Sequence, residues 1–454
     1  MCPNYVVFCK KITMRRLFLA AFVFCSILLV SCHKDDPVVE KTDYTVVVYG
    51  TVGGKMDYLI EGIWAETQQL LPDQKVRVFC VHKYGKEDGF SGHYGQPGEI
   101  VAFELTKDTD FEEVASQGAV IKELPLYEPI CLTTVLDWAE DAAPANNYVL
   151  VLFGHGGGFD ANVDYPKDWA DENDDVYETK GVLYDEWMES RRAMNMYELT
   201  EAIGASKVGH VKGLMFHNCL MGDVQSMTEV APFTDYIIAT PFLMTSEDNP
   251  LIPMLVKNLR EKSDFEAAAR QTVRDSEARM LNGFQHEDPA TMNGNVELLK
   301  SSEINSIGAT VNRLTDRLCE LYPTQKAAID NATNKTYQFS CRKPYFDLLD
   351  YAWNLAVETG DAQLRTIGQE LEADFGRAIL EQVTVDQHVL PALPSYSLSI
   401  VITDRNNFND TIEGKDFTYK QVYDYSDFHT ISQWGQWLDL NEQLPTGNPC
   451  GQVY

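Results

Sequence analysis

Basic residues are scarce in this chain. Its 454 residues include 37 lysines and arginines against 68 aspartates and glutamates, which gives a formal net charge of −31. A protein this acidic repels the phosphates of nucleic acid and the anionic surface of a membrane, so neither is expected as a direct partner. The same negative potential attracts cationic peptides and divalent cations, which favours basic polypeptide substrates.

Closely spaced cysteines and two common motifs are also missing. No Cys-x-x-Cys pair occurs, which argues against structural zinc, and the scattered cysteines do not form a disulfide scaffold. The chain has no Gly-x-Ser-x-Gly motif of a serine hydrolase and no EF-hand spacing. Beyond residue 32 the cysteines are Cys80, Cys131, Cys219, Cys319, Cys341 and Cys450.

The N-terminus has the pattern of a targeting segment. Arg15 and Arg16 precede an apolar run over residues 17–30, which is shorter than the roughly 20 residues that a membrane-spanning helix needs. This pattern is typical of a signal peptide. The alternative is a signal anchor that retains the whole segment.

Cys32 is the predicted start of the mature chain. Leu29-Val30-Ser31-Cys32 resembles the lipobox of bacterial lipoproteins, which implies a lipoprotein signal peptide over residues 1–32 and a lipid on Cys32. Lys34-Asp35-Asp36 resembles the short signal that sends lipoproteins of Bacteroides-like bacteria to the cell surface. We therefore expect an outer-membrane lipoprotein in the cell envelope, which touches the membrane only through its lipid anchor.

After a polar linker over residues 33–43, residues 44–250 alternate apolar strands with helices. This order predicts an α/β domain with a mostly parallel sheet covered on both faces, and with its polar chemistry beyond the carboxyl ends of the strands. Asn146-Asn147 is expected to turn the chain into one of the strands. The expected strands are Thr45–Tyr49, Val76–Val81, Tyr148–Phe153, Val211–Phe216 and Tyr236–Thr240, and the expected helices are 57–71, Thr133–Ala143 and Met196–Ile203.

Residues 251–454 have longer helical patterns and are expected to form a helix-rich C-terminal part with one added strand. The expected helices are Phe265–Leu281, Val296–Leu321 and Pro344–Val357, and the expected strand is Leu398–Ile402.

Two residues with nucleophilic and basic side chains follow predicted strands. Cys219 comes directly after the strand ending near Phe216, and His155 comes directly after the strand ending at Phe153. A thiol attacks as thiolate, so a catalytic cysteine needs an imidazole nearby and donors for the oxyanion that develops. The main-chain N–H groups of Gly156 and Cys219 are the expected oxyanion donors.

Each residue alone has an ordinary reading. A single cysteine after a strand is commonly a packed core thiol. The sequence Gly154-His155-Gly156-Gly157-Gly158 could be a turn, or the oxyanion loop of an esterase, which would require the missing serine motif. Only the two motifs together therefore indicate a catalytic pair.

The pair of motifs resembles the clostripain family (peptidase family C11) of caspase-like cysteine peptidases. Gly154-His155-Gly156-Gly157-Gly158 is followed 64 residues later by Cys219 within Asn218-Cys219-Leu220-Met221-Gly222. Segments near residues 235–239, 345–351, 397–400 and 425–434 resemble later parts of the family. The resemblance implies a caspase-like α/β/α sandwich, a His155/Cys219 dyad, cleavage after arginine or lysine, and self-cleavage between the motifs.

Two positions depart from the family pattern. An acidic residue usually stands two positions before the nucleophile and helps to bind a basic side chain, but His217 stands there. His217 is open to three readings: a wall of the substrate pocket, a second imidazole beside Cys219, or a structural side chain. Residues 240–244 also lack the expected pattern. Glu247 and Asp248 are the best remaining candidates for binding a basic substrate, and the alternative is that both are ordinary loop acids.

The expected activity is that of an exported, lipid-anchored cysteine endopeptidase that needs no cofactor and no metal. Calcium is left open by one acidic loop, which is otherwise solvated surface. The alternative function is a peptide-binding surface lipoprotein of the same fold with weak or no catalysis. The acids of that loop are Asp160, Asp164, Asp168, Asp171, Asp174 and Asp175.

Overall fold

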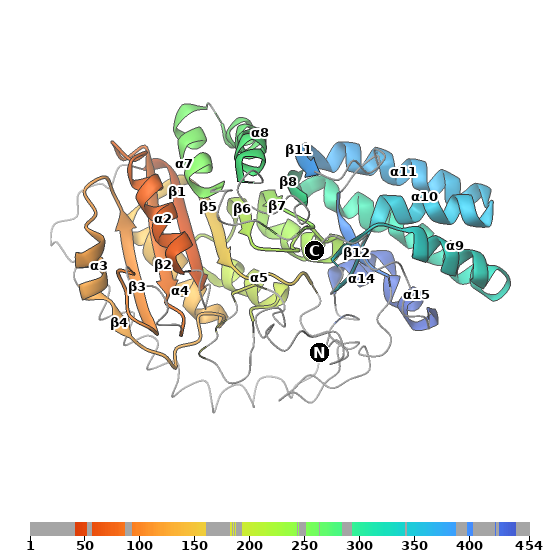
Figure 1. Cartoon of the computed structure of the whole chain (residues 1–454), viewed down its shortest axis with the longest axis horizontal. Helices are drawn as coiled ribbons and strands as arrows, with labels where there is room; N and C mark the ends of the chain where they lie inside the picture. Colours follow the sequence, from red (N-terminus) through yellow and green to blue (C-terminus); the bar gives the residue numbers. More distant parts are fainter. Residues whose placement is uncertain are drawn as a thin grey trace.

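The apolar strands of the sequence form a nine-stranded sheet in the computed structural model of the chain (Figure 1). Its order is β11-β8-β7-β6-β5-β1-β2-β3-β4. The five central strands from β7 to β2 run parallel, and the two at each edge are antiparallel. The structure describes residues 41–51, 57–86, 93–159, 182, 183, 185, 187, 193–242, 244, 251–262, 264–283, 293–340, 343–386, 397–402, 423 and 426–441.

The five expected strands of the first part are confirmed, each within a few residues. The expected turn at Asn146-Asn147 is wrong, because both residues lie inside β5 and Asn147 pairs with Tyr44 of β1. Ladder bonds to the neighbouring strand outweigh the local turn preference of asparagine. The strands of the large sheet are β1 (Thr42–Thr51), β2 (Val76–Lys83), β3 (Glu99–Leu105), β4 (Ala119–Val120), β5 (Ala145–Gly154), β6 (Val211–His217), β7 (Thr234–Ala239), β8 (Asn293–Lys300) and β11 (Ile379–Asp386).

Helices cover both faces of this sheet, as the alternation predicted. Side chains of β1 point alternately to the two sides: Val47 and Tyr49 belong to the apolar cluster that includes α4, α5, α6 and α9, whereas Val46 and Val48 belong to the one that includes α2, α7 and α8. The result is an α/β/α sandwich with one apolar core on each side. These helices are α2 (Asp57–Gln68), α4 (Pro129–Ala142), α5 (Met196–Ala205), α6 (Val224–Val230), α7 (Leu251–Glu261), α8 (Phe265–Gly283) and α9 (Ser301–Lys335), with the short α3 (Phe111–Gln117) and the 3-10 turn Ala231–Phe233 beside them.

Two expected helices of the C-terminal part begin with strands instead. Residues 296–300 belong to β8, which pairs with β7, and residues 343–347 form β10. Both strands run directly into helices, α9 and α10 (Leu348–Thr359), so the apolar pattern continues across each boundary. Pairing with a neighbouring strand, which local periodicity does not reveal, decides the structure of both segments.

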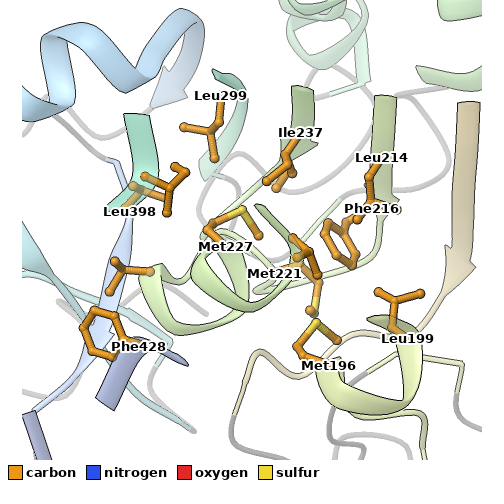
Figure 2. Packing of buried hydrophobic residues seen from close by; sticks show 14 of the residues in the cluster. Met196, Leu199, Leu214, Phe216, Met221, Met227, Ile237, Leu299, Leu398 and Phe428 are labelled. Atoms are coloured by element: carbon orange, nitrogen blue, oxygen red, sulfur yellow. The ribbon is translucent and has the colours of Figure 1, made fainter. Parts of the chain in front are cut away.

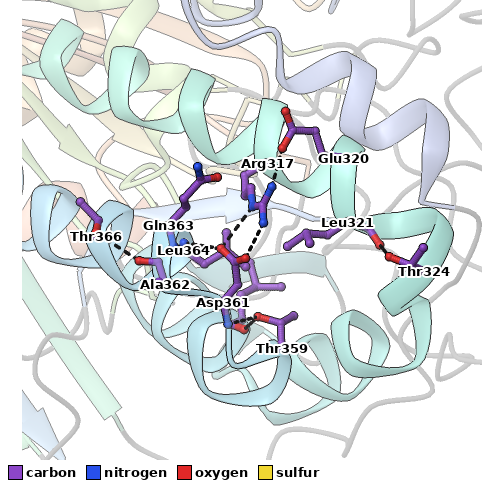
Figure 3. Close-up of polar contacts among 11 residues, drawn as sticks. Arg317, Glu320, Leu321, Thr324, Thr359, Asp361, Ala362, Gln363, Leu364 and Thr366 are labelled. Carbon is purple, nitrogen blue, oxygen red and sulfur yellow. Dashed lines mark hydrogen bonds and ion pairs between the residues drawn. The ribbon is translucent and has the colours of Figure 1, made fainter.

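A helical bundle of α9, α10 and α11 (Ala362–Ala378) lies beside the β8–β11 edge of the sheet (Figure 1). α9 is kinked at Gln325, two residues after Pro323. Arg317 of α9 forms a two-pronged ion pair with Asp361, whose carboxylate also caps the start of α11 (Figure 3). Two short helices, α14 (Asp427–Ser432) and α15 (Trp434–Leu440), pack on α9.

A second, three-stranded sheet joins the bundle to the large sheet. Its order is β12-β10-β9, with β9 (Gln338–Ser340), β10 (Lys343–Asp347) and β12 (Ser399–Val401) all antiparallel. The expected strand at residues 398–402 is therefore confirmed, and it lies in this small sheet.

A buried ion pair fixes the chain between the two motifs. Lys83 at the end of β2 donates to Asp185 over 2.7 Å, and both side chains are fully buried. Lys83 also donates to the carbonyls of Lys122 and Leu124, and burial raises the pKa of Asp185 while it lowers that of Lys83. Nearby, Val182 forms bridges with both Gly156 and Met194.

Asp185→Ala should destabilise the fold by about 3–5 kcal/mol, because it leaves the Lys83 ammonium buried without its counter-ion. The double variant Lys83→Met with Asp185→Leu should recover most of that free energy of unfolding, measured by denaturant titration. The matched control is Asp141→Ala, which breaks an exposed pair with Lys207 and should have a much smaller effect. An equal loss of unfolding free energy in Asp185→Ala and Asp141→Ala would contradict this role of burial.

Candidate active site

The nucleophile candidate lies just beyond β6. Asn218 and Cys219 follow the last strand residue, and Leu220 has a left-handed backbone with φ +59, which is uncommon for a residue with a branched side chain. Leu220 N donates to Phe242 O over 2.8 Å, so the turn is held against the segment after β7. The tight turn leaves the Cys219 side chain partly exposed at the edge of the sheet.

The histidine candidate lies just beyond β5, which is the parallel neighbour of β6. Phe153 pairs with His217, so the two strands end side by side and His155 and Cys219 both stand two residues further along. Asn218 Nδ2 donates to the carbonyls of Gly154 over 2.8 Å and of His155 over 3.2 Å. One amide therefore ties the two loops together.

Gly156 is in direct contact with the main chain at Cys219. A Cβ atom on Gly156 would lie 2.4 Å from Cys219 O and 3.0 Å from Cys219 N, so a side chain does not fit there. Glycine is thus required at this position by close approach of two backbones. The two predicted oxyanion donors belong to these two touching segments.

The Cys219 sulfur has a hydrogen-bond donor from a third segment. Met244 N donates to Cys219 Sγ over 3.2 Å. A backbone N–H dipole that points at the sulfur stabilises negative charge on it. This favours the thiolate, which is the reactive form of a cysteine. The other thiols of the described chain are less suited to reaction: burial raises the pKa of Cys131 to about 12, and that of Cys80 and Cys319 also lies above its ordinary range.

His155 has the electrostatic character of a base. Burial lowers its pKa from the ordinary value of 6.5, because a charged imidazolium is poorly solvated there. The imidazole is therefore neutral at neutral pH and able to accept a proton.

The remaining predicted site residues are placed as follows. His217 is only 3% exposed, and its ring packs against Phe153 with centroids 5.0 Å apart. Cys32, Glu247, Asp248 and the acids of the loop after Phe159 lie outside the residues that the structure describes.

Two general properties of the described residues bear on the site. No group of three or more His, Cys, Asp or Glu side chains among them is arranged to hold a metal ion. None of the helices given above is both long and apolar enough to cross a membrane.

The clostripain family model matches residues 95–365, which is more than half of the chain and includes both motifs. The chain belongs to the clostripain family. It is a cysteine peptidase, and the arrangement of strands around Cys219 and His155 is consistent with that chemistry. No curated protein sequence matches the chain.

Solved structures of similar fold are also C11 proteases. A secreted C11 cysteine protease from Bacteroides thetaiotaomicron, bound to an irreversible peptide inhibitor, is 14% identical with a TM-score of 0.56, over 87% of this chain and 99% of the other. A secreted C11 protease of the same species, iotapain, is 15% identical with a TM-score of 0.53 over 76% and 88%. An inactive zymogen C11 protease from Parabacteroides distasonis is 14% identical with a TM-score of 0.52 over 88% and 99%.

Sequence analysis of this peptidase missed several residues around the site. Asn218 lies inside the quoted nucleophile motif, and its position between a strand end and a cysteine was the available signal. Met244 contributes a main-chain atom, and Tyr345 bonds to the histidine loop, residues 154–158, from another part of the chain. Neither contact leaves a local trace in the sequence.

The pKa of His155 gives a direct test of its environment. In the Cys219→Ala variant, which removes the thiol's own titration, the NMR titration midpoint of His155 should lie below 6.5. Unfolding the same variant in denaturant should return the midpoint to the ordinary value, which is the internal control. A midpoint at or above 6.5 in the folded variant would contradict a desolvated, neutral base.

Proposed function

We propose that the protein is an exported, lipid-anchored cysteine endopeptidase with Cys219 as nucleophile and His155 as base. The observation that carries this proposal is the contact between the two loops. Gly156 touches the main chain of Cys219, and Asn218 bonds to the carbonyls of Gly154 and His155. Nucleophile and base thus come from adjacent parallel strands that end at the same edge of the sheet.

The proposed reaction proceeds through a thioester. His155 takes the proton of Cys219, and Sγ attacks the carbonyl carbon of the scissile peptide bond. The N–H groups of Gly156 and Cys219 donate to the oxyanion, and His155 delivers the proton to the leaving amine as the C–N bond breaks. Water then hydrolyses the thioester and restores the thiol.

Two further elements of the proposal rest on sequence. The lipobox supports a lipid anchor at Cys32, and the export signal supports the outer membrane or the cell surface. Self-cleavage between the motifs is supported by the family resemblance and by the basic residues Lys180, Arg191 and Arg192. Val182 and Asp185, which follow Lys180, are held by contacts with Gly156 and Lys83.

A further element of the proposal is cleavage after a basic residue. The net charge of −31 attracts cationic substrates, and a basic side chain in a partly dry pocket requires a carboxylate partner. His217 is buried against Phe153, so we propose Glu247 and Asp248 as the carboxylates. The same burial supports the reading of His217 as a structural side chain.

Cys219→Ala and His155→Ala should each lower peptide turnover by at least about 10³-fold, because the two groups act as one unit, and the double variant should be no worse than either. A peptidyl chloromethyl ketone should label wild type at Cys219 only. The matched control is Cys319→Ala, which removes another partly exposed thiol and should keep both turnover and labelling. If wild type that is cut between the motifs takes up no label and cleaves no peptide, this supports the alternative of a binding lipoprotein.

Matched peptide substrates that differ only in the residue before the scissile bond test the specificity. Arginine or lysine should exceed its uncharged analogue in kcat/KM by more than about tenfold, since an unpaired buried charge costs several kcal/mol. Glu247→Ala or Asp248→Ala should remove this preference. Asp108→Ala, which deletes an exposed acid in the turn after β3, should leave it intact and so separates a local partner from the overall field. A preference for an apolar or acidic residue would overturn basic specificity.

A further inference from the structure

The small sheet of the C-terminal part reaches the histidine loop through a tyrosine. Tyr345 of β10 donates its hydroxyl proton to Gly157 O over 2.7 Å, and its side chain is only 1% exposed. Gly157 stands two residues after His155. A buried hydroxyl thus fixes the main chain of the histidine loop from a strand 188 residues away.

Gly158, the next residue, leaves room for the same tyrosine side chain. Gly158 has a left-handed backbone with φ +76, and a Cβ atom there would lie 2.2 Å from the Tyr345 hydroxyl oxygen and 2.4 Å from Cζ. The last glycine of the histidine motif is therefore explained by contact with Tyr345, without any contact with substrate.

The same small sheet also contacts the cysteine loop, which is the segment after β6 that carries Cys219. Ser399 N of β12 donates to Gly222 O over 2.9 Å, and Ser399 forms a bridge with Asp223. Val401 of β12 pairs with Tyr345, and the two pack with Leu220 in a cluster that also touches Cys219. One three-stranded unit thus contacts the main chain after the base and the main chain after the nucleophile.

We propose that Tyr345 is a positioning residue for the oxyanion site. Its hydroxyl holds Gly157 O in place, and this anchors the short glycine segment whose preceding residue, Gly156, lies against the main chain of Cys219. This inference rests on the proposed Cys219/His155 mechanism. It assigns a part in transition-state stabilisation to a residue that acts through the main chain around Gly157, because a donor displaced by about 1 Å loses a large part of its effect.

Tyr345→Phe isolates the hydroxyl, because it keeps the buried ring. Peptide hydrolysis develops an oxyanion, whereas alkylation of Cys219 by iodoacetamide does not. We expect kcat for a peptide substrate to fall about tenfold or more while KM stays within about twofold. The rate of Cys219 alkylation, followed by peptide mass spectrometry, and its pH profile should match those of wild type.

Tyr49→Phe is the matched control. The Tyr49 hydroxyl is also fully buried and donates to a main-chain carbonyl, Leu126 O, over 2.7 Å, but this acceptor belongs to neither motif. Both variants lose the same kind of bond and should lose a similar amount of melting temperature, yet only Tyr345→Phe should lose kcat. Val401→Ala, which keeps the hydroxyl but removes packing beside the Tyr345 ring, should lower kcat in the same direction by a smaller factor.

Two results would overturn the inference. One is a kcat for Tyr345→Phe no lower than that for Tyr49→Phe; the other is a parallel fall in hydrolysis and alkylation, which would indicate general disruption of the site. Failure of the proposed function itself looks different, because wild type would then hydrolyse no peptide and Cys219→Ala would change nothing.

Discussion

The pairing of β5 with β6 is the constraint on which the site depends. Because these strands are parallel and in register at Phe153 and His217, the residues that follow them leave the sheet side by side. The approach is so close that Gly156 admits no side chain against Cys219. Apolar side chains pack directly beneath: Figure 2 shows Met221, two residues after Cys219, beside Phe216 of β6. Apolar burial thus sets the backbone positions that the chemistry requires.

The C-terminal part completes this arrangement. Its β8 pairs with β7 and its β11 with β8. The strand β11 begins at Ile379 and thus still belongs to the large sheet that starts at Thr42. Glu297 of β8 is fully buried, accepts a hydrogen bond from Ser397 just before β12, and has its pKa raised to about 8 by burial. The large sheet and the small sheet are therefore joined by a polar contact as well as by packing.

Sequence reasoning found the features that are encoded locally. Runs such as Val46–Tyr49 are β-branched or aromatic and buried, and they became strands; the two motifs followed from residue type and position after a strand. Sequence reasoning failed where pairing with a residue far along the chain decides the local structure. Residues 296–300 continue the apolar pattern of α9 and form a strand because β7 and β11 pair with them. Tyr345 and Asp185 likewise meet Gly157 and Lys83 across 188 and 102 residues, and no local pattern records such contacts.

The Lys83–Asp185 pair has a consequence for how the chain is connected. Val182 is paired on both sides, with Gly156 and Met194, and Asp185 is locked to β2, so the segment entering α5 is held in place by non-covalent bonds. Covalent continuity through residues 160–181 is then not what keeps this segment beside the histidine loop. The fold is in that sense suited to tolerate a break in the chain between its two motifs, with its sheet order unchanged.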